Sequence, residues 1–389
     1  MTIVVTGGGS GGHITPILAV AHELKQLDPT LTIVYIGQKG DKLSDIPAAD
    51  PNIDEVFAVS AGKFRRYHGE GWKQLLDVST QYMNIRDGFR VLKGLWQSYR
   101  IIKKLQPVVV FTRGGFVSVP VALGGKLNGV PFITHDSDSI PSLANRIIAR
   151  WATMNTVALP EEIYPYVQSK TKTVGIPLAH DYEFVTPELQ KTYRAELGLE
   201  TYTQMLFVTG GGNGARDLNN AVVDNAETLL RQYPGLCIVH VAGRIHEVVT
   251  NTAYDAKLSS EARTRVMVHG FLSGLYKNIG AADVVIARAG ATNLAEFAVQ
   301  GKACIIVPAE QLVGGHQIEN ARIFEERDAI MLMTQAQVDQ ERRLAMVVGD
   351  LLGNEPRRQQ LGANLHAFAR TDAAQSLAML LLDIAKPKQ

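Results

Sequence analysis

The hydrophobic residues of this chain follow two alternating patterns. Short runs rich in β-branched residues, typical of buried parallel strands, alternate with longer segments whose apolar residues recur at helical spacing. In the N-terminal half these runs predict strands at 2–6, 31–37, 107–113 and 131–136. Between the first two strands a helical pattern begins, with Thr15 as its predicted cap and Pro16 in its first turn. Strand, glycine loop, helix and strand form a βαβ unit, which predicts a parallel sheet with helices on both faces.

The same order of elements begins again in the second half of the chain. Residues 205–222, MLFVTGGGNGARDLNNAV, have the pattern of a strand, a glycine loop and a helix, and further strands are predicted at 237–243, 265–271, 283–290 and 303–308. The economical interpretation is an α/β chain of two doubly wound, Rossmann-like domains. We expect an N-terminal domain at 1–172 and a C-terminal domain at 173–365. A helix within 366–389 could belong to either domain or pack back on the first.

The composition is that of a folded protein and does not indicate a strongly charged partner such as nucleic acid. The chain has 389 residues, of which 46% are hydrophobic and 20% charged, and its formal net charge is +1. A net charge this close to zero gives no overall electrostatic attraction to nucleic acid. The N-terminal strand is too short for a signal peptide, and no run approaches the roughly 18 apolar residues that cross a bilayer. We therefore expect a cytoplasmic protein without a membrane-spanning helix, which leaves attachment to a membrane surface open.

The first glycine loop, GGGSGGH at 7–13, matches the dinucleotide fingerprint G-x-G-x-x-G. A dehydrogenase would also place an acid at the end of the second strand to hold the ribose. Here that strand ends in YIGQKG, with no acid before Asp41, so an NAD site is disfavoured. A helix N-terminus still binds anions through its bare N–H groups, and the second loop, GGGNGA at 210–215, has the same form. The alternative for either loop is a tight strand–helix turn without a ligand.

The most informative stretch lies between residues 283 and 320. A helix is predicted to start near Asn293, which would put Glu296 in its first turn. The Glu296 carboxylate could interact with the helix dipole, or it could accept both hydroxyls of a ribose whose phosphates lie over the same N-terminus. Further along, HQIEN offers Gln317 and Asn320 on one helix face. Amide side chains present donors and acceptors together, which suits recognition of sugar hydroxyls.

Taken together, these motifs resemble the MurG family of glycosyltransferases. The chain's GGGSGGHITPILAVAHEL is similar to the family's first glycine loop, FTRGGFVSVPVALGGKLNGVP to its GGYVSxP stretch, and SLANRIIARWA to its acceptor-side loop. Its GGGNGAR looks like the family's second loop, while ARAGATNLAEFAVQGKACIIVP and HQIENA look like the donor motif and the element after it. The matches are ordered and run through nearly the whole chain, so they are far more specific than one glycine loop.

The resemblance implies a GT-B architecture, in which two Rossmann-like domains face a central cleft, and an inverting, UDP-GlcNAc-dependent hexosyltransferase. Members of the family transfer N-acetylglucosamine to the C4 hydroxyl of the muramyl sugar of lipid I, which gives lipid II for peptidoglycan synthesis. The implied partners are UDP-GlcNAc, an undecaprenyl-linked muramyl-peptide acceptor, an anionic membrane surface and other cell-wall synthesis proteins. The implied location is the cytoplasmic face of the cell membrane, and neither nucleic acid nor an obligatory cofactor is expected.

The resemblance also implies which residues bind the two substrates. Glu296 would hold the ribose, Gln317 the sugar hydroxyls, and the backbone of Leu272 the uracil edge. The implied UDP-GlcNAc-binding residues are Ser10, Gly11, Gly12, Asp138, Gly212, Leu272, Ala291, Thr292, Asn293, Leu294, Ala295, Glu296 and Gln317. The implied acceptor-side residues are Gly114, Gly115, His135 and Asp136.

The chain departs from the family pattern at three places, two short stretches and one single residue. The family's H-E-Q-N stretch appears here as HDSD at 135–138, and its G-N-P-V-R stretch as GIPLA, which puts Ala179 at the arginine position. Gly212 stands where the family usually has serine. These departures bear on donor and acceptor specificity and not on the fold.

Inverting transfer needs a base on the acceptor hydroxyl and stabilisation of the departing diphosphate. His13 ends the first loop and histidine titrates near neutral pH, so His13 is the predicted catalytic base. Asp136 and Asp138 are the next candidates. The alternative for His13 is a structural residue that caps its own helix. Asp136 and Asp138 also have the spacing of a DxD pair, but they fall on the acceptor side, and we expect no metal site.

Residues 62–106 mix aromatic, aliphatic and basic side chains. Basic residues beside exposed apolar ones suit an anionic bilayer surface. We therefore predict membrane contact for 63–76, through Phe64, Arg65, Arg66, Trp72, Leu75 and Leu76. For 89–102 we predict core packing instead, because its apolar residues have the spacing of a buried helix face: Phe89, Leu92, Leu95, Trp96 and Tyr99.

Three other functions stay open on the sequence alone. Another lipid-directed GT-B transferase would use a different UDP-sugar or acceptor. A UDP-GlcNAc 2-epimerase has a similar two-domain frame, but it needs acids to exchange the C2 proton and no lipid-facing patch. A non-catalytic nucleotide-sugar binder would need neither His13 nor Gln317.

Overall fold

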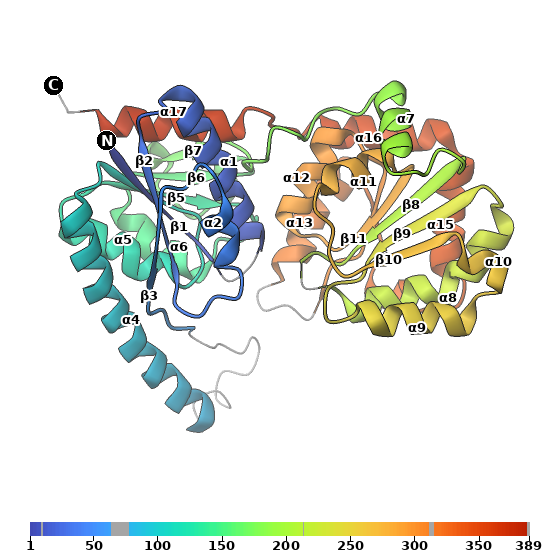
Figure 1. Cartoon of the computed structure of the whole chain (residues 1–389), viewed down its shortest axis with the longest axis horizontal. Helices are drawn as coiled ribbons and strands as arrows, with labels where there is room; N and C mark the ends of the chain where they lie inside the picture. Colours follow the sequence, from blue (N-terminus) through green and yellow to red (C-terminus); the bar gives the residue numbers. More distant parts are fainter. Residues whose placement is uncertain (9–10, 64–77, 213, 311–314, 387–389) are drawn as a thin grey trace. The chain divides into compact units, whose positions relative to one another are not determined.

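The chain divides into two compact units in the computed structural model, which describes residues 1–8, 11–63, 78–212, 214–310 and 315–386. Unit 1 contains Met1–His180 and Arg370–Gln389, and unit 2 contains Asp181–Ala369. Each unit is a parallel sheet flanked by helices (Figure 1). The functional domain limits expected above, 1–172, 173–365 and 366–389, stay predictions.

Unit 1 is built on a seven-stranded sheet of order β3-β2-β1-β4-β5-β6-β7. Its strands are β1 (Thr2–Thr6), β2 (Thr32–Gln38), β3 (Glu55–Val59), β4 (Val109–Thr112), β5 (Phe132–Asp136), β6 (Met154–Val157) and β7 (Thr171–Thr173). Its helices are α1 (Gly11–Leu27), α2 (Asp45–Ala49), α4 (Val78–Leu105), α5 (Ser118–Leu127), α6 (Leu143–Ile148) and α17 (Ala373–Ala385), with short 3₁₀ segments η1 (Ala149–Trp151), η2 (Glu161–Ile163) and η3 (Gln168–Lys170). The winding reverses between β1 and β4, and ligands of such folds bind beside the carboxyl ends of the strands at that point.

Alternate residues of β1 pack in two hydrophobic clusters, one on each face of the sheet. Ile3 and Val5 pack in a cluster that includes Ile17 of α1 and Leu377 of α17. Val4 packs in a second cluster with residues of α4 and α5. The last helix of the chain therefore lies beside its first helix and completes the core of unit 1.

Unit 2 repeats this architecture with a six-stranded sheet of order β10-β9-β8-β11-β12-β13. Its strands are β8 (Gln204–Thr209), β9 (Leu236–Val241), β10 (Val266–His269), β11 (Val284–Ala287), β12 (Cys304–Ile306) and β13 (Met331–Leu332). Its helices are α7 (Pro187–Glu196), α8 (Arg216–Gln232), α9 (Glu247–Lys257), α10 (Ser260–Arg263), α11 (Leu275–Ala281), α12 (Ala291–Gln300), α13 (His316–Glu325), α14 (Gln335–Val338), α15 (Arg343–Gly353) and α16 (Glu355–His366). The switch point of this sheet lies between β8 and β11. The prediction of two doubly wound, parallel α/β domains is confirmed.

Two helices begin earlier than the sequence pattern predicts. Helix α1 starts at Gly11, so Thr15 is no cap and Pro16 lies inside the helix. The carbonyl of Gly12, which would accept the bond that Pro16 cannot donate, lies 3.5 Å from Nη2 of Arg113. Helix α12 starts at Ala291 after Gly290, and this places Glu296 in the second turn instead of the first.

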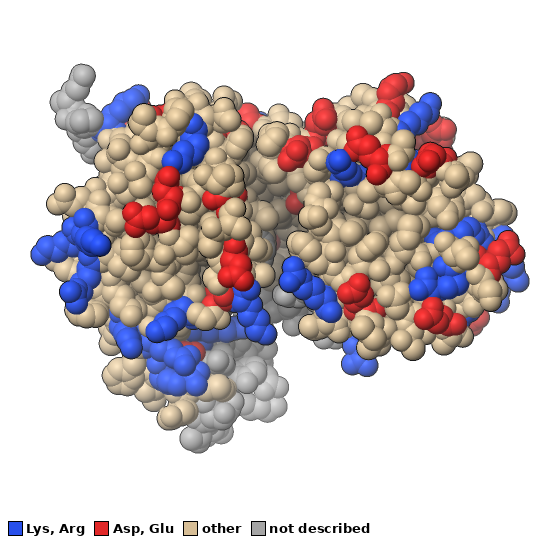
Figure 2. All heavy atoms as spheres, viewed as in Figure 1, with Lys and Arg blue, Asp and Glu red and all other residues tan. Residues whose placement is uncertain are grey.

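Helix α4 corrects part of the prediction that residues 89–102 pack in the core: Ile102 is buried in the core, whereas Leu95 and Tyr99 are only half-buried. Phe89, Leu92 and Trp96 are 69%, 63% and 57% exposed, and Tyr82 and Ile85 continue this apolar stripe toward the start of the helix. The N-terminal half of α4 projects beyond the sheet, and no part of the sheet covers it (Figure 1). Lys and Arg side chains gather on this part of unit 1 (Figure 2). The sequence of α4 itself includes Arg86, Arg90, Lys93, Arg100 and Lys103.

No helix among the described residues combines the length and the apolar character needed to cross a membrane.

Candidate active site

His13 lies in the first turns of α1, directly after the glycine loop that follows β1. Its Nδ1 atom is 2.8 Å from the carbonyl oxygen of Gly8. Because a carbonyl only accepts, Nδ1 carries the proton in this contact and Nε2 keeps its lone pair. Burial and the nearby Arg113 guanidinium lower the pKa of His13. The histidine is therefore neutral at neutral pH and has one nitrogen able to take a proton.

The loop after β4 lies against the first glycine loop. Gly114 and Gly115 have φ angles of +90° and +83°, which side chains rarely adopt. A Cβ atom on Gly115 would lie 2.9 Å from the carbonyl oxygen of Gly8 and 3.5 Å from Nδ1 of His13. The two loops can approach this closely only because glycine occupies both sides, and the approach holds the carbonyl that orients His13.

Arg113 is a buried cation at the centre of this region that the sequence reading did not single out. Its guanidinium donates to the hydroxyl of Ser137, and it is 3% exposed. Burial lowers the pKa of Arg113 to about 10, while Asp138 and Asp136 oppose that shift. A guanidinium stays charged at neutral pH under these conditions, so it compensates the acidic residues of the HDSD stretch.

Asp136 ends β5 and is almost fully buried. Its Oδ1 atom accepts from the backbone N–H of Ser142 at 3.2 Å, and its Oδ2 atom accepts from the hydroxyl of Tyr166 at 2.6 Å. Burial raises the pKa of Asp136 to about 6. His135 is buried completely, its Nδ1 lies 3.0 Å from Oγ1 of Thr156, and burial holds its pKa well below the usual value.

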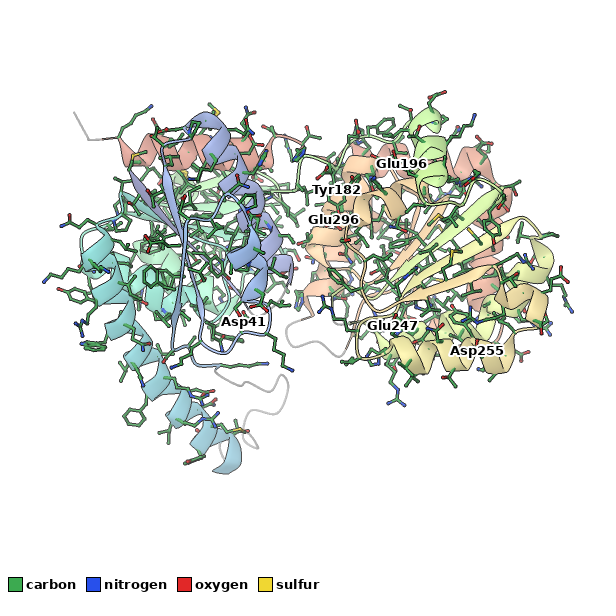
Figure 3. All side chains as sticks on the ribbon, in the orientation of Figure 1. Asp41, Tyr182, Glu196, Glu247, Asp255 and Glu296 are labelled. Carbon is green, nitrogen blue, oxygen red and sulfur yellow. The ribbon has the colours of Figure 1, made fainter. Side chains whose placement is uncertain are left out.

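Among its described residues, unit 2 has one buried carboxyl group at the carboxyl end of its sheet. Glu296 of α12 is 9% exposed, and its Oε2 atom has no hydrogen-bond partner among the described residues. The hydroxyl of Tyr182 hydrogen-bonds this carboxyl group, and the two side chains lie together in Figure 3. Burial raises the pKa of Glu296 to about 7. A buried oxygen without a protein donor is suited to accept from a ligand hydroxyl.

The N-terminus of α12 is held firmly beside this carboxyl group. Arg288 donates from Nη1 to the carbonyl oxygens of Val307 and Pro308 at 3.0 and 3.2 Å, which ties the loops after β11 and β12 together. Leu294 is buried and its N–H already bonds the carbonyl of Gly290. The first N–H groups of the helix, those of Ala291, Thr292 and Asn293, have no intrahelical acceptor. Free N–H groups at a helix N-terminus can bind an anion such as a phosphate.

The remaining donor-side residues lie around the same end of the sheet. Gln317 is in the first turn of α13, and its Oε1 atom accepts from the N–H of Ala309 at 2.9 Å, which leaves its NH₂ group to donate. Leu272 follows β10, and Gly212 lies in the loop after β8. A Cβ atom on Gly212 would meet no atom within 4 Å, so a serine side chain has room there.

The structure thus brings His13, Gly12, Gly114, Gly115, Asp136 and Asp138 to one end of unit 1, and the α12 residues, Gln317, Leu272 and Gly212 to one end of unit 2. Several predicted residues lie outside what the structure describes: Ser10 and the predicted membrane-contact residues Phe64, Arg65, Arg66, Trp72, Leu75 and Leu76. Gly11 is described only as the first residue of α1. Sequence reasoning missed Arg113, Tyr166 and Tyr182. Only Arg113 had a local signal, since it directly precedes the Gly-Gly pair after β4.

Comparisons with known proteins agree with this arrangement. Residues 3–157 match the glycosyltransferase family 28 N-terminal domain, and residues 205–377 match the family 28 C-terminal domain. The chain is 33% identical, over 99% of both sequences, to the UDP-N-acetylglucosamine–N-acetylmuramyl-(pentapeptide) pyrophosphoryl-undecaprenol N-acetylglucosamine transferase of Geobacillus kaustophilus. Numerous further curated relatives carry the same name.

Similar solved structures show the fold. The crystal structure of MurG from Acinetobacter baumannii has a TM-score of 0.71 and 22% identity, over 98% of this chain and 99% of that one. A UDP-GlcNAc 2-epimerase from Neisseria meningitidis bound to UDP-GlcNAc has a TM-score of 0.64 at 10% identity, over 98% and 100% of the two chains. Since both enzymes share the architecture, fold alone does not separate the transferase from the epimerase. The sequence relatives separate them.

Proposed function

The chain belongs to the MurG family within glycosyltransferase family 28, and we propose from this membership that it transfers N-acetylglucosamine from UDP-GlcNAc to the muramyl sugar of a polyprenyl-diphosphate-linked muramyl-pentapeptide. The product is lipid II, the precursor of peptidoglycan. The observation that carries the proposal is the near-complete span over which the chain matches relatives named for this reaction. Transfer inverts the anomeric centre, because in a single in-line displacement the acceptor oxygen bonds to the anomeric carbon on the face opposite the departing UDP.

His13 acts as the general base. The Nε2 lone pair removes the proton of the C4 hydroxyl while the oxygen attacks the anomeric carbon of the donor. The Gly8 carbonyl holds the ring in the tautomer that this step requires, and Arg113 disfavours a proton on the ring before the reaction. The Asp136 carboxyl group, held by Tyr166 and Ser142, orients the acceptor side.

The N-terminus of α12 stabilises the departing UDP. The charge that develops on the diphosphate lies over the N–H groups of Ala291, Thr292 and Asn293, which are fixed before the reaction and need no reorganisation. Glu296 accepts the ribose hydroxyls, and Gln317 donates its NH₂ group to the sugar. The proposed binding set includes Leu272 for the uracil and the loop at Gly212.

The acceptor is a membrane lipid, and the enzyme works at the cytoplasmic face of the membrane. The apolar stripe of α4 supports this placement, because Tyr82, Ile85, Phe89, Leu92 and Trp96 lie exposed among basic residues. An amphipathic helix of this kind binds an anionic bilayer surface without crossing it.

The test incubates the purified protein with UDP-GlcNAc, with and without the polyprenyl-linked muramyl-pentapeptide, and measures products by mass spectrometry. The proposal predicts UDP release and an acceptor heavier by one N-acetylhexosamine only when both substrates are present. Formation of the C2 epimer of UDP-GlcNAc without acceptor would show an epimerase. Transfer of a different sugar, or binding without turnover, would identify another transferase or a nucleotide-sugar binder.

A further inference from the structure

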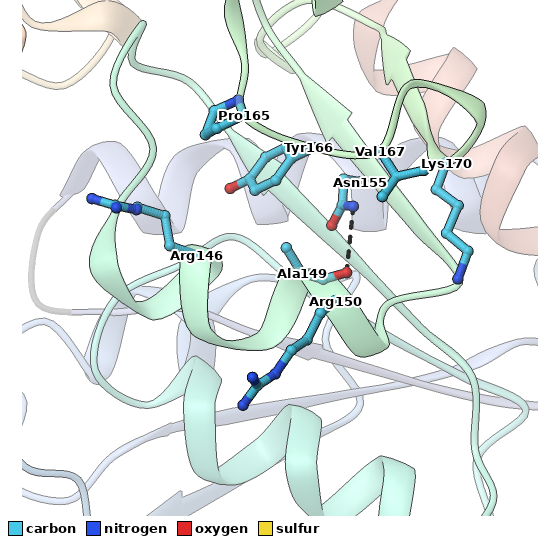
Figure 4. A pocket seen from close by; sticks show the side chains of 8 residues that line it. All are labelled: Arg146, Ala149, Arg150, Asn155, Pro165, Tyr166, Val167 and Lys170. Atoms are coloured by element: carbon cyan, nitrogen blue, oxygen red, sulfur yellow. Dashed lines mark hydrogen bonds between the residues drawn. The ribbon is translucent and has the colours of Figure 1, made fainter.

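A pocket of about 320 Å³ lies in unit 1 away from the glycine loops (Figure 4). Arg146 and Arg150 reach it from α6 and η1, and Lys170 reaches it from the end of η3. Tyr166 and Val167 close it from the segment between η2 and η3. Its volume is in the range of pockets that bind small ligand groups.

The polar lining of this pocket is cationic. Arg146, Arg150 and Lys170 line it, and no Asp or Glu does. None of the three side chains forms an ion pair with any residue that the structure describes. The Arg150 guanidinium lies over the ring of Trp151, 3.9 Å from its centroid, which limits the positions it can take. Three unpaired cations around one concavity favour an anionic ligand.

The other walls of the pocket are apolar. Ala149, Pro165 and Val167 contribute aliphatic surface, and Tyr166 contributes its ring. The amide of Asn155 is already used, because it donates to the Ala149 carbonyl at 3.4 Å and accepts from the Thr134 hydroxyl at 2.7 Å. Aliphatic walls with cations at the rim suit a small amino-acid residue that ends in a carboxylate better than a bare phosphate.

Tyr166 connects this pocket with the acceptor side of the site. Its ring lines the pocket, and its hydroxyl donates to Oδ2 of Asp136 at 2.6 Å. One side chain therefore separates the cationic pocket from a residue proposed to orient the acceptor. A pentapeptide attached to the muramyl sugar spans up to about 17 Å when extended. This length exceeds the separation of one side chain between Asp136 and the pocket.

We propose that the pocket of Arg146, Arg150 and Lys170 binds the carboxylate end of the acceptor's peptide. This inference rests on the proposed function, since it assigns a subsite to the same acceptor. It makes the pocket a determinant of acceptor specificity, with Tyr166 coupling peptide binding to the position of Asp136.

The test compares two acceptors in steady-state transfer, one with a free carboxyl end on its peptide and one with that end amidated. In the wild-type protein, amidation raises the acceptor KM about tenfold, because a charged hydrogen-bonding partner is lost. In Arg146→Gln and in the double variant Arg146→Gln/Lys170→Gln, the KM for the free-carboxyl acceptor rises and the difference between the two acceptors disappears. Lys172→Gln removes a nearby exposed cation that does not line the pocket, and it leaves the difference intact.

Three results would overturn the inference. The wild-type protein could show equal KM values for both acceptors, or the variants could raise both values equally, which would indicate a phosphate contact or damage to the fold. The variants could instead lower binding to anionic vesicles with the KM ratio unchanged, which would assign these cations to the membrane. If the wild-type protein transferred no sugar to either acceptor, the proposed function itself would be contradicted. The affinities of the protein for the two acceptors, measured by direct binding, would then test the pocket independently of turnover.

Discussion

The carboxyl ends of the two sheets have the same topology and opposite chemistry. In unit 1 the end of the sheet carries four titratable groups: Arg113 and Asp136 are buried, and His13 and Asp138 are half-buried. The charges of Arg113 and Asp138 both act on His13. In unit 2 the corresponding end has helix N–H groups, an amide and, among the residues that the structure describes, one buried carboxyl group, that of Glu296, with an oxygen that has no hydrogen-bond partner there. Our proposal therefore gives the two units of this repeated architecture different tasks: unit 1 handles a proton, and unit 2 holds a ligand.

The largest effect expected from this division is the loss of turnover in His13→Ala. General-base help contributes typically about 10²–10⁴-fold, so kcat falls by that order while the KM for UDP-GlcNAc stays within about twofold. Steady-state kinetics with saturating acceptor measures both constants. Unchanged kcat would remove His13 as the base and leave Asp136 or Asp138 to be tested.

The pH dependence of donor binding sharpens the role of unit 2. The pKa of Glu296 is raised to about 7, and only the ionised form accepts from both ribose hydroxyls without a proton in the way. The ionised fraction falls from about nine-tenths at pH 8 to about one-tenth at pH 6, so the KM for UDP-GlcNAc rises about tenfold over this range.

Glu296→Gln is the control for that titration. Its KM for UDP-GlcNAc is higher than that of the wild type at pH 8 and does not change between pH 8 and pH 6. A wild-type KM that is flat over this range would argue against the carboxylate as the ribose acceptor.

A smaller effect is expected at the apolar stripe of α4 in unit 1. Trp96→Glu places a charge among exposed apolar residues, so binding to anionic vesicles falls several-fold in co-sedimentation while turnover with a detergent-solubilised acceptor is retained. Met379→Glu, on α17 of the same unit and equally exposed at 57%, is the matched control and leaves vesicle binding unchanged. Equal losses in the two variants would show that the effect is only one of net charge.

The smallest effect is a gain at Gly212. A serine fits there without contact, and its hydroxyl restores the group that the family usually carries at this position. Gly212→Ser lowers the KM for UDP-GlcNAc by about threefold, the contribution of one neutral hydrogen bond, with the melting temperature unchanged. A higher KM would mean that the loop approaches the donor through its backbone alone.

The sequence predicted the central strands of both sheets because long β-branched runs need burial on both faces. It missed β3, β6, β7 and β13, of which β3, β7 and β13 are edge strands and β6 has only four residues. Helix α1 began four residues before the predicted cap, since glycines can enter a helix without a capping side chain. The stripe of α4 was misjudged because periodicity shows that a helix has an apolar face, but it does not show what covers that face.

The donor and acceptor motifs could be recognised in the sequence, whereas the residues that hydrogen-bond or charge-compensate their side chains could not. Tyr182 and Tyr166 lie far along the chain from the Glu296 and Asp136 carboxyl groups that they bond. Arg113 meets Ser137 and the acidic residues only because β4 and β5 are neighbours in the sheet. Such contacts depend on the tertiary structure and leave no spacing in the sequence.

Equilibrium binding of UDP-GlcNAc tests the division between the two units most directly. Calorimetry at pH 8 compares the wild type, His13→Ala and Glu296→Gln without acceptor, so no turnover enters the measurement. The account predicts that His13→Ala binds the donor within about twofold of the wild type, whereas Glu296→Gln binds about tenfold or more weakly. Loss of donor binding in His13→Ala with full affinity in Glu296→Gln would contradict it.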